Sequence, residues 1–247
     1  MNEHIEKAAG LIAGARKIVA FTGAGVSAES GIPTYRGEGG MWKEYDPSKY
    51  ADYGYFMKNP TYYWSFFKDV RYRSLVASNP NKAHRAIARL EELGKLDTVI
   101  TQNIDGLHQA AGNTKVIELH GNTKVIGCLD CFAEYDYEEI HEQVQTEMPP
   151  TCNACGGMLK PRVVFFGEAL PHGAMEDAAQ AVTQADLMLV VGSTLAVFPA
   201  ASLPLLAKRA GAALVIVNLG ETAMDELADA FVDAKAGEVL PRMVEPG

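Results

Sequence analysis

Cysteine is the residue type whose spacing in this chain points most directly to chemistry. The four cysteines form two C-x2-C pairs, Cys128 with Cys131 and Cys152 with Cys155, and twenty residues separate the pairs. Two such turns can complete a tetrahedral Zn²⁺ site. The alternatives are two short disulfides or four unrelated thiols, but a chain without an export signal is expected to keep its thiols reduced. We therefore favour one zinc ion, and because four sulfur ligands leave no open coordination position, we expect it to be structural.

A second pattern is a glycine turn directly after a short apolar segment. Gly23, Ala24, Gly25 and Ala28 fit the G-x-G-x-x-G/A pattern, in which glycines let backbone amides approach a pyrophosphate. A hydride-transferring dehydrogenase would place an acidic residue about 20 positions further on, at the end of a second strand. Here residues 43–46 lie in an aromatic segment without a strand pattern. The turn thus favours a dinucleotide, and hydride transfer is disfavoured.

Polar residues also follow two other strand-like segments. Gln102, Asn103 and Asp105 come after the first of these, and His120 comes after the second. Strand ends of this kind lie at the carboxyl edge of a parallel sheet, where ligands bind. We interpret the amide and carboxylate groups as ligand contacts, and His120 as a candidate general base, because a neutral imidazole accepts protons near pH 7. The other histidines, His108 among them, are interpreted as packing, capping or surface residues.

The elements that must position these residues follow from hydrophobic periodicity. Helical spacing is seen at 3–15, 82–93, 172–184 and 199–210, and short apolar strands at 17–21, 98–101, 116–119, 187–191 and 214–217. Alternation of this kind predicts an α/β fold, a parallel sheet with helices on both faces. The aromatic segment from 33 to 80 is expected to form a loop and covering helices, and the cysteine segment at 122–162 is expected to be an insert.

Composition excludes several function classes. The chain is 48% hydrophobic and 21% charged, which fits one substantial core, and its formal net charge of -9 argues against sequence-independent binding to nucleic acid. No apolar run is long enough to span a bilayer, so we expect no membrane insertion. The first residues carry charges and no apolar signal core, which predicts a cytoplasmic protein.

Taken together, these segments resemble the sirtuins, the NAD-dependent protein deacylases. The resemblance covers nearly the whole chain and rests on the paired cysteines and on six further motifs: GAGVSAESGIPTYRG (23–37), TQNIDGLH (101–108), ELHG (118–121), KPRVVFFGE (160–168), GSTLAVFP (192–199) and VNLGE (217–221). It implies one catalytic domain, with a Rossmann-like doubly wound part at about 1–32, 82–121 and 163–247. A smaller helical module at about 33–81 and a zinc-ribbon module at about 122–162 complete it, and NAD and an acyl-lysine peptide would meet in a cleft.

The resemblance also implies a reaction. Departure of nicotinamide from NAD creates an electrophilic ribose carbon that the acyl oxygen attacks, and His120 would then deprotonate the ribose hydroxyls. The products are free lysine, nicotinamide and O-acetyl-ADP-ribose. Asn103 would hold the ribose and a water, and Asp105 the nicotinamide carboxamide. The other implied NAD contacts are Gly23, Ala24, Gly25, Ala28, Tyr35, Arg36, Gln102, Ile104, Gly192, Ser193, Thr194, Asn218, Leu219, Lys235 and Ala236. The peptide would pair with a strand edge at Val164, Phe165, Phe166 and Gly167.

Three departures from the family pattern refine this expectation. Tyr35 stands where the family usually has phenylalanine, and Gly192-Ser193-Thr194 reverses the usual order of the two hydroxyl residues. The Tyr-x-x-Arg pair of family members that prefer acidic acyl groups does not occur in residues 50–80, which predicts neutral acyl groups, acetyl first. The expected partners are acetylated proteins or peptides. The alternative reading is a mono-ADP-ribosyltransferase that uses the same NAD site, and a zinc-stabilised NAD sensor without turnover is a further alternative.

Overall fold

The structure, a computed structural model, describes residues 2–35, 40–72 and 77–245, and divides the chain into two compact units. Unit 1 comprises residues 1–34, 79–119 and 172–247, and unit 2 comprises residues 35–78 and 120–171. The two units are described separately below. The domain borders expected from the sequence, at 32/33, 81/82, 121/122 and 162/163, remain a prediction.

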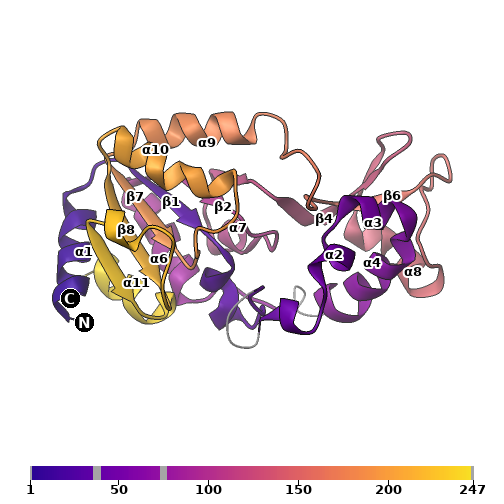
Figure 1. Cartoon of the computed structure of the whole chain (residues 1–247), viewed down its shortest axis with the longest axis horizontal. Coiled ribbons are helices and arrows are strands. Elements are labelled where there is room, and N and C mark those ends of the chain that lie inside the picture. The colour runs from indigo at the N-terminus through magenta and orange to yellow at the C-terminus, as the bar shows by residue number, and fades with distance from the viewer. Residues whose placement is uncertain (1, 36–39, 73–76, 246–247) are drawn as a thin grey trace. The chain divides into compact units, whose positions relative to one another are not determined.

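Unit 1 is built around a six-stranded sheet in which every pair of neighbouring strands is parallel (Figure 1). Its order, β3-β2-β1-β7-β8-β9, is the Rossmann order 3-2-1-4-5-6 when the strands are counted along the chain. Successive strands are therefore added on one side of β1 up to β3, and on its other side from β7 on, so the strand order reverses between β1 and β7. The strands are β1 (Ile18–Thr22), β2 (Leu96–Thr101), β3 (Val116–Glu118), β7 (Leu187–Val191), β8 (Ala213–Asn218) and β9 (Ala230–Asp233).

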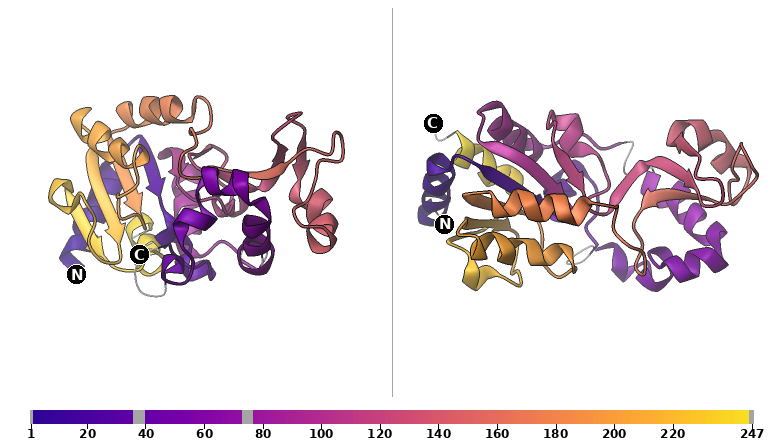
Figure 2. Two further views of the ribbon diagram at one scale, coloured as in Figure 1. Left: turned by 45° about the vertical axis from the view of Figure 1, so that its right-hand side comes forward. Right: turned by 90° about the horizontal axis from the view of Figure 1, so that it is seen from above.

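Helices cover both faces of this sheet, as the views in Figures 1 and 2 show. The first face packs against α1 (Asn2–Gly14), α6 (Lys82–Glu92) and α11 (Ala236–Val244), and the second against α9 (Ala174–Thr183) and α10 (Leu203–Arg209). Unit 1 also contains α7 (Leu107–Ala111) and the short 3₁₀ segments η1 (Ala24–Ser30), η4 (Ala200–Ser202) and η5 (Asp225–Leu227). This confirms the predicted α/β class with a doubly wound parallel sheet.

Two elements of unit 1 differ from the sequence pattern. The segment 199–210 is not one helix, because a 3₁₀ turn precedes α10 and Pro204 lies in the first turn of α10. Proline lacks the backbone N–H that a helix interior requires, so it fits best where a helix begins. The periodicity did not single out β9 or α11. Strand β9 is only four residues long, and its pairing with β8 defines it.

Unit 2 combines helices with a three-stranded antiparallel sheet, β5-β4-β6. The sheet joins β4 (Gly121–Cys128), β5 (Glu134–Asp136) and β6 (Leu159–Val163), and α8 (Tyr137–Thr146) follows β5. The aromatic segment forms η2 (Met41–Lys43), α2 (Pro47–Tyr50), α3 (Tyr53–Lys58), α4 (Pro60–Phe66) and η3 (Phe67–Arg71), a π-helical turn. Trp64, fully buried, donates a hydrogen bond of 3.1 Å from its ring nitrogen to the backbone oxygen of Leu159, and so ties these helices to β6.

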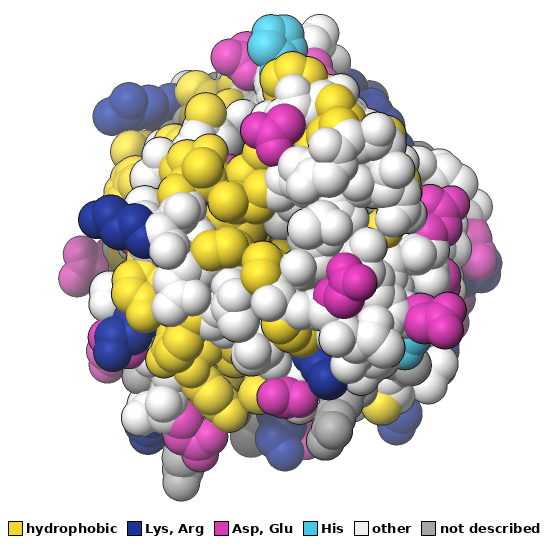
Figure 3. Space-filling view, turned by 90° about the vertical axis from the view of Figure 1, so that its right-hand side faces the viewer, with side chains coloured by type: hydrophobic (Ala, Val, Ile, Leu, Met, Phe, Trp, Pro, Cys, Tyr) yellow, Lys and Arg dark blue, Asp and Glu magenta, His cyan; other side chains and the backbone are white. Residues whose placement is uncertain are grey.

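One face of the molecule carries side chains of mixed character. In the face shown in Figure 3, hydrophobic side chains lie between separate acidic and basic groups, and the lysines and arginines do not form a continuous patch on that face. Among residues 2–35, 40–72 and 77–245, no helix is both long enough and apolar enough to cross a bilayer.

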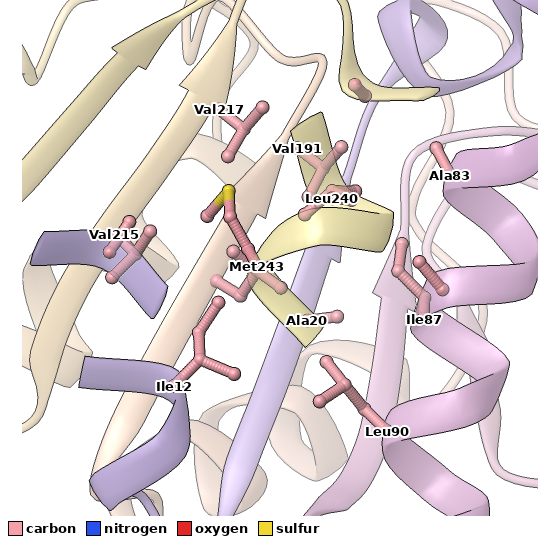
Figure 4. Close-up of a cluster of buried hydrophobic side chains, with 14 of the residues drawn as sticks. Ile12, Ala20, Ala83, Ile87, Leu90, Val191, Val215, Val217, Leu240 and Met243 are labelled. Carbon is pink, nitrogen blue, oxygen red and sulfur yellow. The ribbon is translucent and has the colours of Figure 1, made fainter. Parts of the chain in front are cut away.

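The core of unit 1 follows from side chains that alternate along buried strands. In β1, Ile18 and Ala20 belong to the cluster under α1, α6 and α11, whereas Val19 and Phe21 belong to the cluster under α9 and α10. All four are 0% exposed, as expected for a central strand covered on both faces. Figure 4 shows the first cluster, where Ile12, Ile87, Leu240 and other apolar side chains converge on the sheet. This core holds the strand ends, and therefore the loops beyond them, in place.

Two histidines are buried next to the carboxyl ends of β1 and β2. His84 of α6 and His108 of α7 are 0% and 1% exposed, and their rings lie edge to face with centroids 4.9 Å apart. The Nε2 atom of His108 lies 2.9 Å from the hydroxyl oxygen of Thr22, the last residue of β1. Burial is the main cause that lowers the pKa of His84 to about 4 and that of His108 to about 3. Both rings are therefore neutral at pH 7.

These lowered pKa values predict that the protein is sensitive to acid. Above pH 6.5 the histidines are neutral in both the folded and the unfolded chain; below it the unfolded chain binds protons first, so stability is lost until the folded pKa values are reached. We expect the free energy of unfolding to fall by about 1.5 kcal/mol per histidine between pH 6.5 and 5. Urea unfolding followed by circular dichroism measures this, with His108→Gln expected to remove about half of the effect.

His4, which is exposed in α1, supplies the control. The variant His4→Gln is expected to keep the full pH dependence. If the free energy of unfolding fell equally with pH in His108→Gln and in the wild type, the buried neutral state assigned to His108 would be wrong.

Candidate functional site

The strands of unit 1 bring the predicted ligand residues to one edge of the sheet. Because β1, β2, β7, β8 and β9 run parallel, the segments that follow Thr22, Thr101, Val191, Asn218 and Asp233 all leave from the carboxyl edge. In doubly wound folds, ligands bind at this edge where the strand order reverses. Here that position lies between β1 and β7.

Two glycine turns meet at this position. The N–H of Gly25 donates a hydrogen bond of 2.8 Å to the oxygen of Gly192, and the N–H of Gly192 donates one of 2.9 Å to the oxygen of Val217. A Cβ atom on Gly25 would lie 2.7 Å from the Cα of Gly192, and Gly192 itself has a φ of +63°. Neither position tolerates a side chain, so the two loops pack backbone to backbone at the edge where doubly wound folds bind a dinucleotide.

A buried hydrogen-bond network stands beside this turn. The side-chain amide of Asn103 donates to the hydroxyl of Ser27 at 3.0 Å and to the oxygen of Gly23 at 3.2 Å. Ser27 in turn donates to the carboxylate of Asp105 at 2.7 Å, and the other oxygen of that carboxylate accepts the N–H of Leu107 at 2.9 Å. Asn103 is 8% exposed. The network fixes both an amide and a carboxylate in one orientation.

His84 and Thr101 contact two members of this network, Ser27 and Asn103. The Nε2 atom of His84 lies 3.4 Å from the hydroxyl of Ser27, and the hydroxyl of Thr101 accepts the N–H of Asn103 at 3.0 Å. From the sequence alone, His84 is interpreted as a packing residue, and Ser27 lies in the predicted NAD loop without an individual role. The available signal was the position of Ser27 inside the glycine pattern, but only the tertiary structure brings α6, and with it His84, next to that turn.

The other predicted NAD contacts of unit 1 also lie on the loops of the carboxyl edge. Ser193, 6% exposed, donates to the side-chain oxygen of Gln102 at 2.8 Å, which links the loops after β7 and β2. The amide of Asn218 holds its own loop by donating to the oxygen of Gly220 at 2.8 Å. Thr194, Leu219 and Lys235 are exposed, whereas Ile104 and Ala236 are buried.

The predicted site residues of unit 2 fall into two places. The backbone oxygen of the half-buried His120 accepts the N–H of Val164 at 2.9 Å, so the candidate base lies beside the candidate peptide strand. Val164 and Phe166 point outward from this segment, whereas Phe165 is 4% exposed. Tyr35 accepts a hydrogen bond of 3.0 Å from Arg71, whose guanidinium also lies over the Tyr35 ring. Arg36 lies outside the described residues.

The four cysteines converge at the end of the three-stranded sheet. Their sulfur atoms all lie within 4.8 Å of one another, with Cys128 to Cys155 at 3.7 Å and Cys131 to Cys152 at 3.6 Å. Sulfurs bound tetrahedrally at ~2.3 Å from zinc are separated by about 3.8 Å, so the set fits one zinc ion. The four thiols are free, and these distances are far too long for disulfides, which span ~2.05 Å.

The sequence around the cysteines builds this site locally. The N–H groups of Asp130 and Cys131 point at the sulfur of Cys128, at 3.4 and 3.5 Å, as expected of a metal-binding turn. The phenol of Tyr135 lies 3.1 Å from the sulfur of Cys152 and is the main cause that lowers the pKa of that thiol to about 6. Such donors favour the thiolate form that zinc binds.

Removal of the metal is expected to destabilise unit 2. We expect one zinc ion per chain by elemental analysis, and loss of that ion together with a fall in melting temperature in Cys128→Ser, because the small sheet has little core of its own. The variant Lys124→Ala, at an exposed position of β4, is the control and should keep its zinc. Full zinc content in Cys128→Ser would contradict the site.

The glycine contact predicts a specific loss of dinucleotide binding. In Gly25→Ala the new methyl group clashes with Gly192, so the two turns must separate, and the affinity for NAD is expected to fall about tenfold or more, ~1.4 kcal/mol. Isothermal titration calorimetry measures the affinity. Gly10→Ala, at an exposed position of α1 with open space around it, should bind NAD normally. Equal affinity in Gly25→Ala and the wild type would refute the assigned turn.

Comparison with known proteins gives a consistent result. The family model described as the Sir2 family matches residues 23–199. The chain is 47% identical over 246 residues to the "NAD-dependent protein deacylase 2" of Archaeoglobus fulgidus, covering 99% of this chain and 96% of the relative. It is 44% identical to the "NAD-dependent protein deacetylase" of Sulfurisphaera tokodaii, covering 92% and 89%.

Solved structures show the same relationship. A structure described under "Structural Basis for the Mechanism and Regulation of Sir2 Enzymes" is similar with a TM-score of 0.91 at 47% identity, covering 99% of this chain and 97% of that chain. A second, "Sir2 bound to acetylated peptide", is similar with a TM-score of 0.91 at 39% identity, covering 98% of each chain. On its sequence, its fold and the arrangement of its glycine turns and cysteines, this chain belongs to the Sir2 family.

Proposed function

We propose that this protein is an NAD-dependent protein-lysine deacetylase. It transfers the acetyl group of acetyl-lysine to ADP-ribose, with consumption of one water, and releases nicotinamide, free lysine and O-acetyl-ADP-ribose. The observation that carries the proposal is the buried network of Asn103, Ser27 and Asp105 beside the Gly25 turn. It occurs in a chain similar over almost its full length to proteins named NAD-dependent protein deacylase or deacetylase.

The residues of unit 1 have the properties that binding NAD requires. Bound NAD supplies an electrophilic ribose carbon once its nicotinamide leaves. The proposed pyrophosphate contact is the backbone of the loop after β1, which the close packing of Gly25 on Gly192 holds at the carboxyl edge. The carboxylate of Asp105, held by Ser27 and Leu107, suits a carboxamide donor, and the fixed amide of Asn103 suits a ribose and an ordered water.

We assign the remaining contacts by the place of each residue on the carboxyl edge. Gln102, held by Ser193, would contact the nicotinamide ribose. The adenosine half would lie against the loops after β7, β8 and β9. Its proposed contacts are Gly192, Ser193, Thr194, Asn218, Leu219, Lys235 and Ala236, and those of the loop after β1 are Gly23, Ala24, Gly25, Ala28, Tyr35 and Arg36.

His120 is the proposed general base. Its backbone oxygen accepts the N–H of Val164 at 2.9 Å, which holds it beside the candidate peptide strand. A half-buried imidazole in its neutral form can take a proton from a ribose hydroxyl. The outward-facing Val164 and Phe166, with the backbone of Phe165 and Gly167, would receive the acyl-lysine peptide as an added strand.

The acyl group is proposed to be neutral, with acetyl preferred. The guanidinium of Arg71 donates to Tyr35 and lies 5.3 Å and 5.7 Å from the ring centroids of Tyr35 and Phe66, so these two aromatic side chains orient it. Solved relatives are described as bound to an acetylated peptide and to a propionylated peptide, both neutral acyl groups.

We further propose one structural zinc ion at Cys128, Cys131, Cys152 and Cys155, and a cytoplasmic location, because four free thiols close together persist in a reducing compartment. The expected partners are acetylated proteins or peptides. The net charge of -9 favours lysine-rich segments over nucleic acid.

The proposal predicts that nicotinamide release depends on the acetyl group. Purified, zinc-loaded protein is incubated with NAD, with or without an acetyl-lysine peptide, and nicotinamide, peptide mass and the ADP-ribose product are measured. Matched deacetylation and O-acetyl-ADP-ribose are expected. Equal nicotinamide release with and without the peptide would instead indicate NAD hydrolysis or mono-ADP-ribosyl transfer. Tight binding of NAD without nicotinamide release would indicate a sensor.

The role of His120 gives a second prediction. His120→Ala is expected to lose deacetylation by about 100-fold or more, because general base catalysis contributes at least that much, while NAD affinity stays within a few-fold. His172→Ala, which removes an exposed histidine, is the matched control. Deacetylation by His120→Ala at the rate of the control would refute the assigned base.

A further inference from the structure

One buried ion pair in unit 2 has no part in the reaction proposed above. Lys160, at 5% exposure, lies on β6, and its ammonium is 2.8 Å from the carboxylate of Glu168. Charged side chains are rarely buried to this extent, because taking them out of water is costly unless each charge is paired and hydrogen-bonded. The contacts of this pair therefore indicate what it is retained for.

The hydrogen bonds of the two charged side chains fall on the segment 161–168. The ammonium of Lys160 donates to the backbone oxygens of Val163 at 2.6 Å and Pro161 at 3.3 Å, and it lies 4.0 Å from the centroid of the Phe165 ring. The Glu168 carboxylate accepts the N–H of Phe165 at 2.7 Å. The same carboxylate oxygen thus receives both the ammonium and a backbone amide of the candidate peptide strand.

These contacts lie on the inner side of an alternating segment. Val163 and Phe165 are buried, and Phe165 packs against Tyr63 and Phe56, with ring centroids 4.8 Å and 5.5 Å away. The side chains of Val164 and Phe166 point the other way, since successive residues of an extended chain face opposite sides. The ion pair supports the side that faces the core and leaves the outward side chains to contact a ligand.

The rest of the segment is held at single points. Val164 donates to the oxygen of His120, Phe166 donates to the oxygen of Ala51 at 2.7 Å, and Tyr53 donates to the oxygen of Phe166 at 3.0 Å. Among the described residues, the regular pairing of β6 with β4 ends at Val163, and only an isolated bridge, between Asp52 and Phe166, follows it. The paired charges of Lys160 and Glu168 take the place of a neighbouring strand there.

We propose that Lys160 and Glu168 form a positioning pair that fixes residues 163–166 in the extended conformation that the acyl-lysine peptide pairs with. This inference rests on the proposed function for the identity of the peptide, but the rigidity of the segment does not depend on it. The pair touches neither the NAD residues nor the acetyl group in this assignment. Its loss therefore weakens peptide recognition and leaves NAD binding intact.

Three variants and a control test the proposal. Lys160→Met keeps the apolar stem over Phe165 and removes the charge, Glu168→Gln keeps an acceptor for the Phe165 amide, and the double variant leaves no buried charge. Arg162→Met is the control, because it breaks the exposed pair of Arg162 with Glu134, 2.9 Å apart, on the same strand. The measurements are KM for an acetyl-lysine peptide, Kd for NAD, and amide hydrogen exchange of residues 163–168.

In each of the three variants we expect KM for the peptide to rise about tenfold or more, which is ~1.4 kcal/mol. Kd for NAD should stay within about twofold, and exchange of residues 163–168 should accelerate. The double variant should resemble either single variant, since both charges act as one unit. The control should resemble the wild type in all three measurements.

Unchanged KM and unchanged exchange in folded, zinc-containing variants would overturn the proposal, as would a lower melting temperature without either effect. If Lys160→Met does not fold, Glu168→Gln alone decides the outcome, because it nearly preserves shape and the backbone hydrogen bond. A wild-type protein without acetyl-dependent nicotinamide release would overturn the proposed function instead, and hydrogen exchange would still test the pair.

Discussion

Gly25 and Gly192 meet where the strand order of the sheet reverses, so closely that neither can carry a side chain. The contact joins the loop after β1 to the loop after β7, and the hydrogen bond from Gly192 to Val217 adds the end of β8. The backbones of three loops are thereby joined at the carboxyl edge. Doubly wound folds bind a dinucleotide at this edge, where close backbone packing requires glycine.

Buried hydrogen bonds hold the polar groups around this contact in place. Asn103 and Asp105 both bond to Ser27, which lies next to the buried His84. Behind them, the hydroxyl of Thr22 contacts Thr101 and His108. Burial keeps both imidazoles neutral, so they can act as hydrogen-bond partners without adding positive charge next to the carboxylate. The orientation of Asn103 and Asp105 is therefore set before any ligand binds, which reduces the cost of binding.

Unit 2 is stabilised differently, because its antiparallel sheet has only three strands. Sheets of this size need additional support. The cysteine cluster supplies it at one end, and the aromatic packing of Trp64, Phe56 and Tyr63, together with the hydrogen bond from Trp64 to Leu159, adds to it. The segment that leaves β6 toward Glu168 extends beyond the sheet itself, and there charges rather than strands hold the backbone.

The sequence by itself determined the α/β class, the glycine turn, the cysteine quartet and the family, because each depends on local spacing: strand and helix periods, positions that exclude a Cβ, and thiols three residues apart. It also indicated Asn103 and Asp105 through their place after a strand. Only the tertiary structure decided that His84 supports Ser27, that Arg71 holds Tyr35, and that Lys160 pairs with Glu168. Partners far apart in sequence, or spaced without a period, leave no local pattern. Their contact is decided by how the elements pack, which no single segment encodes.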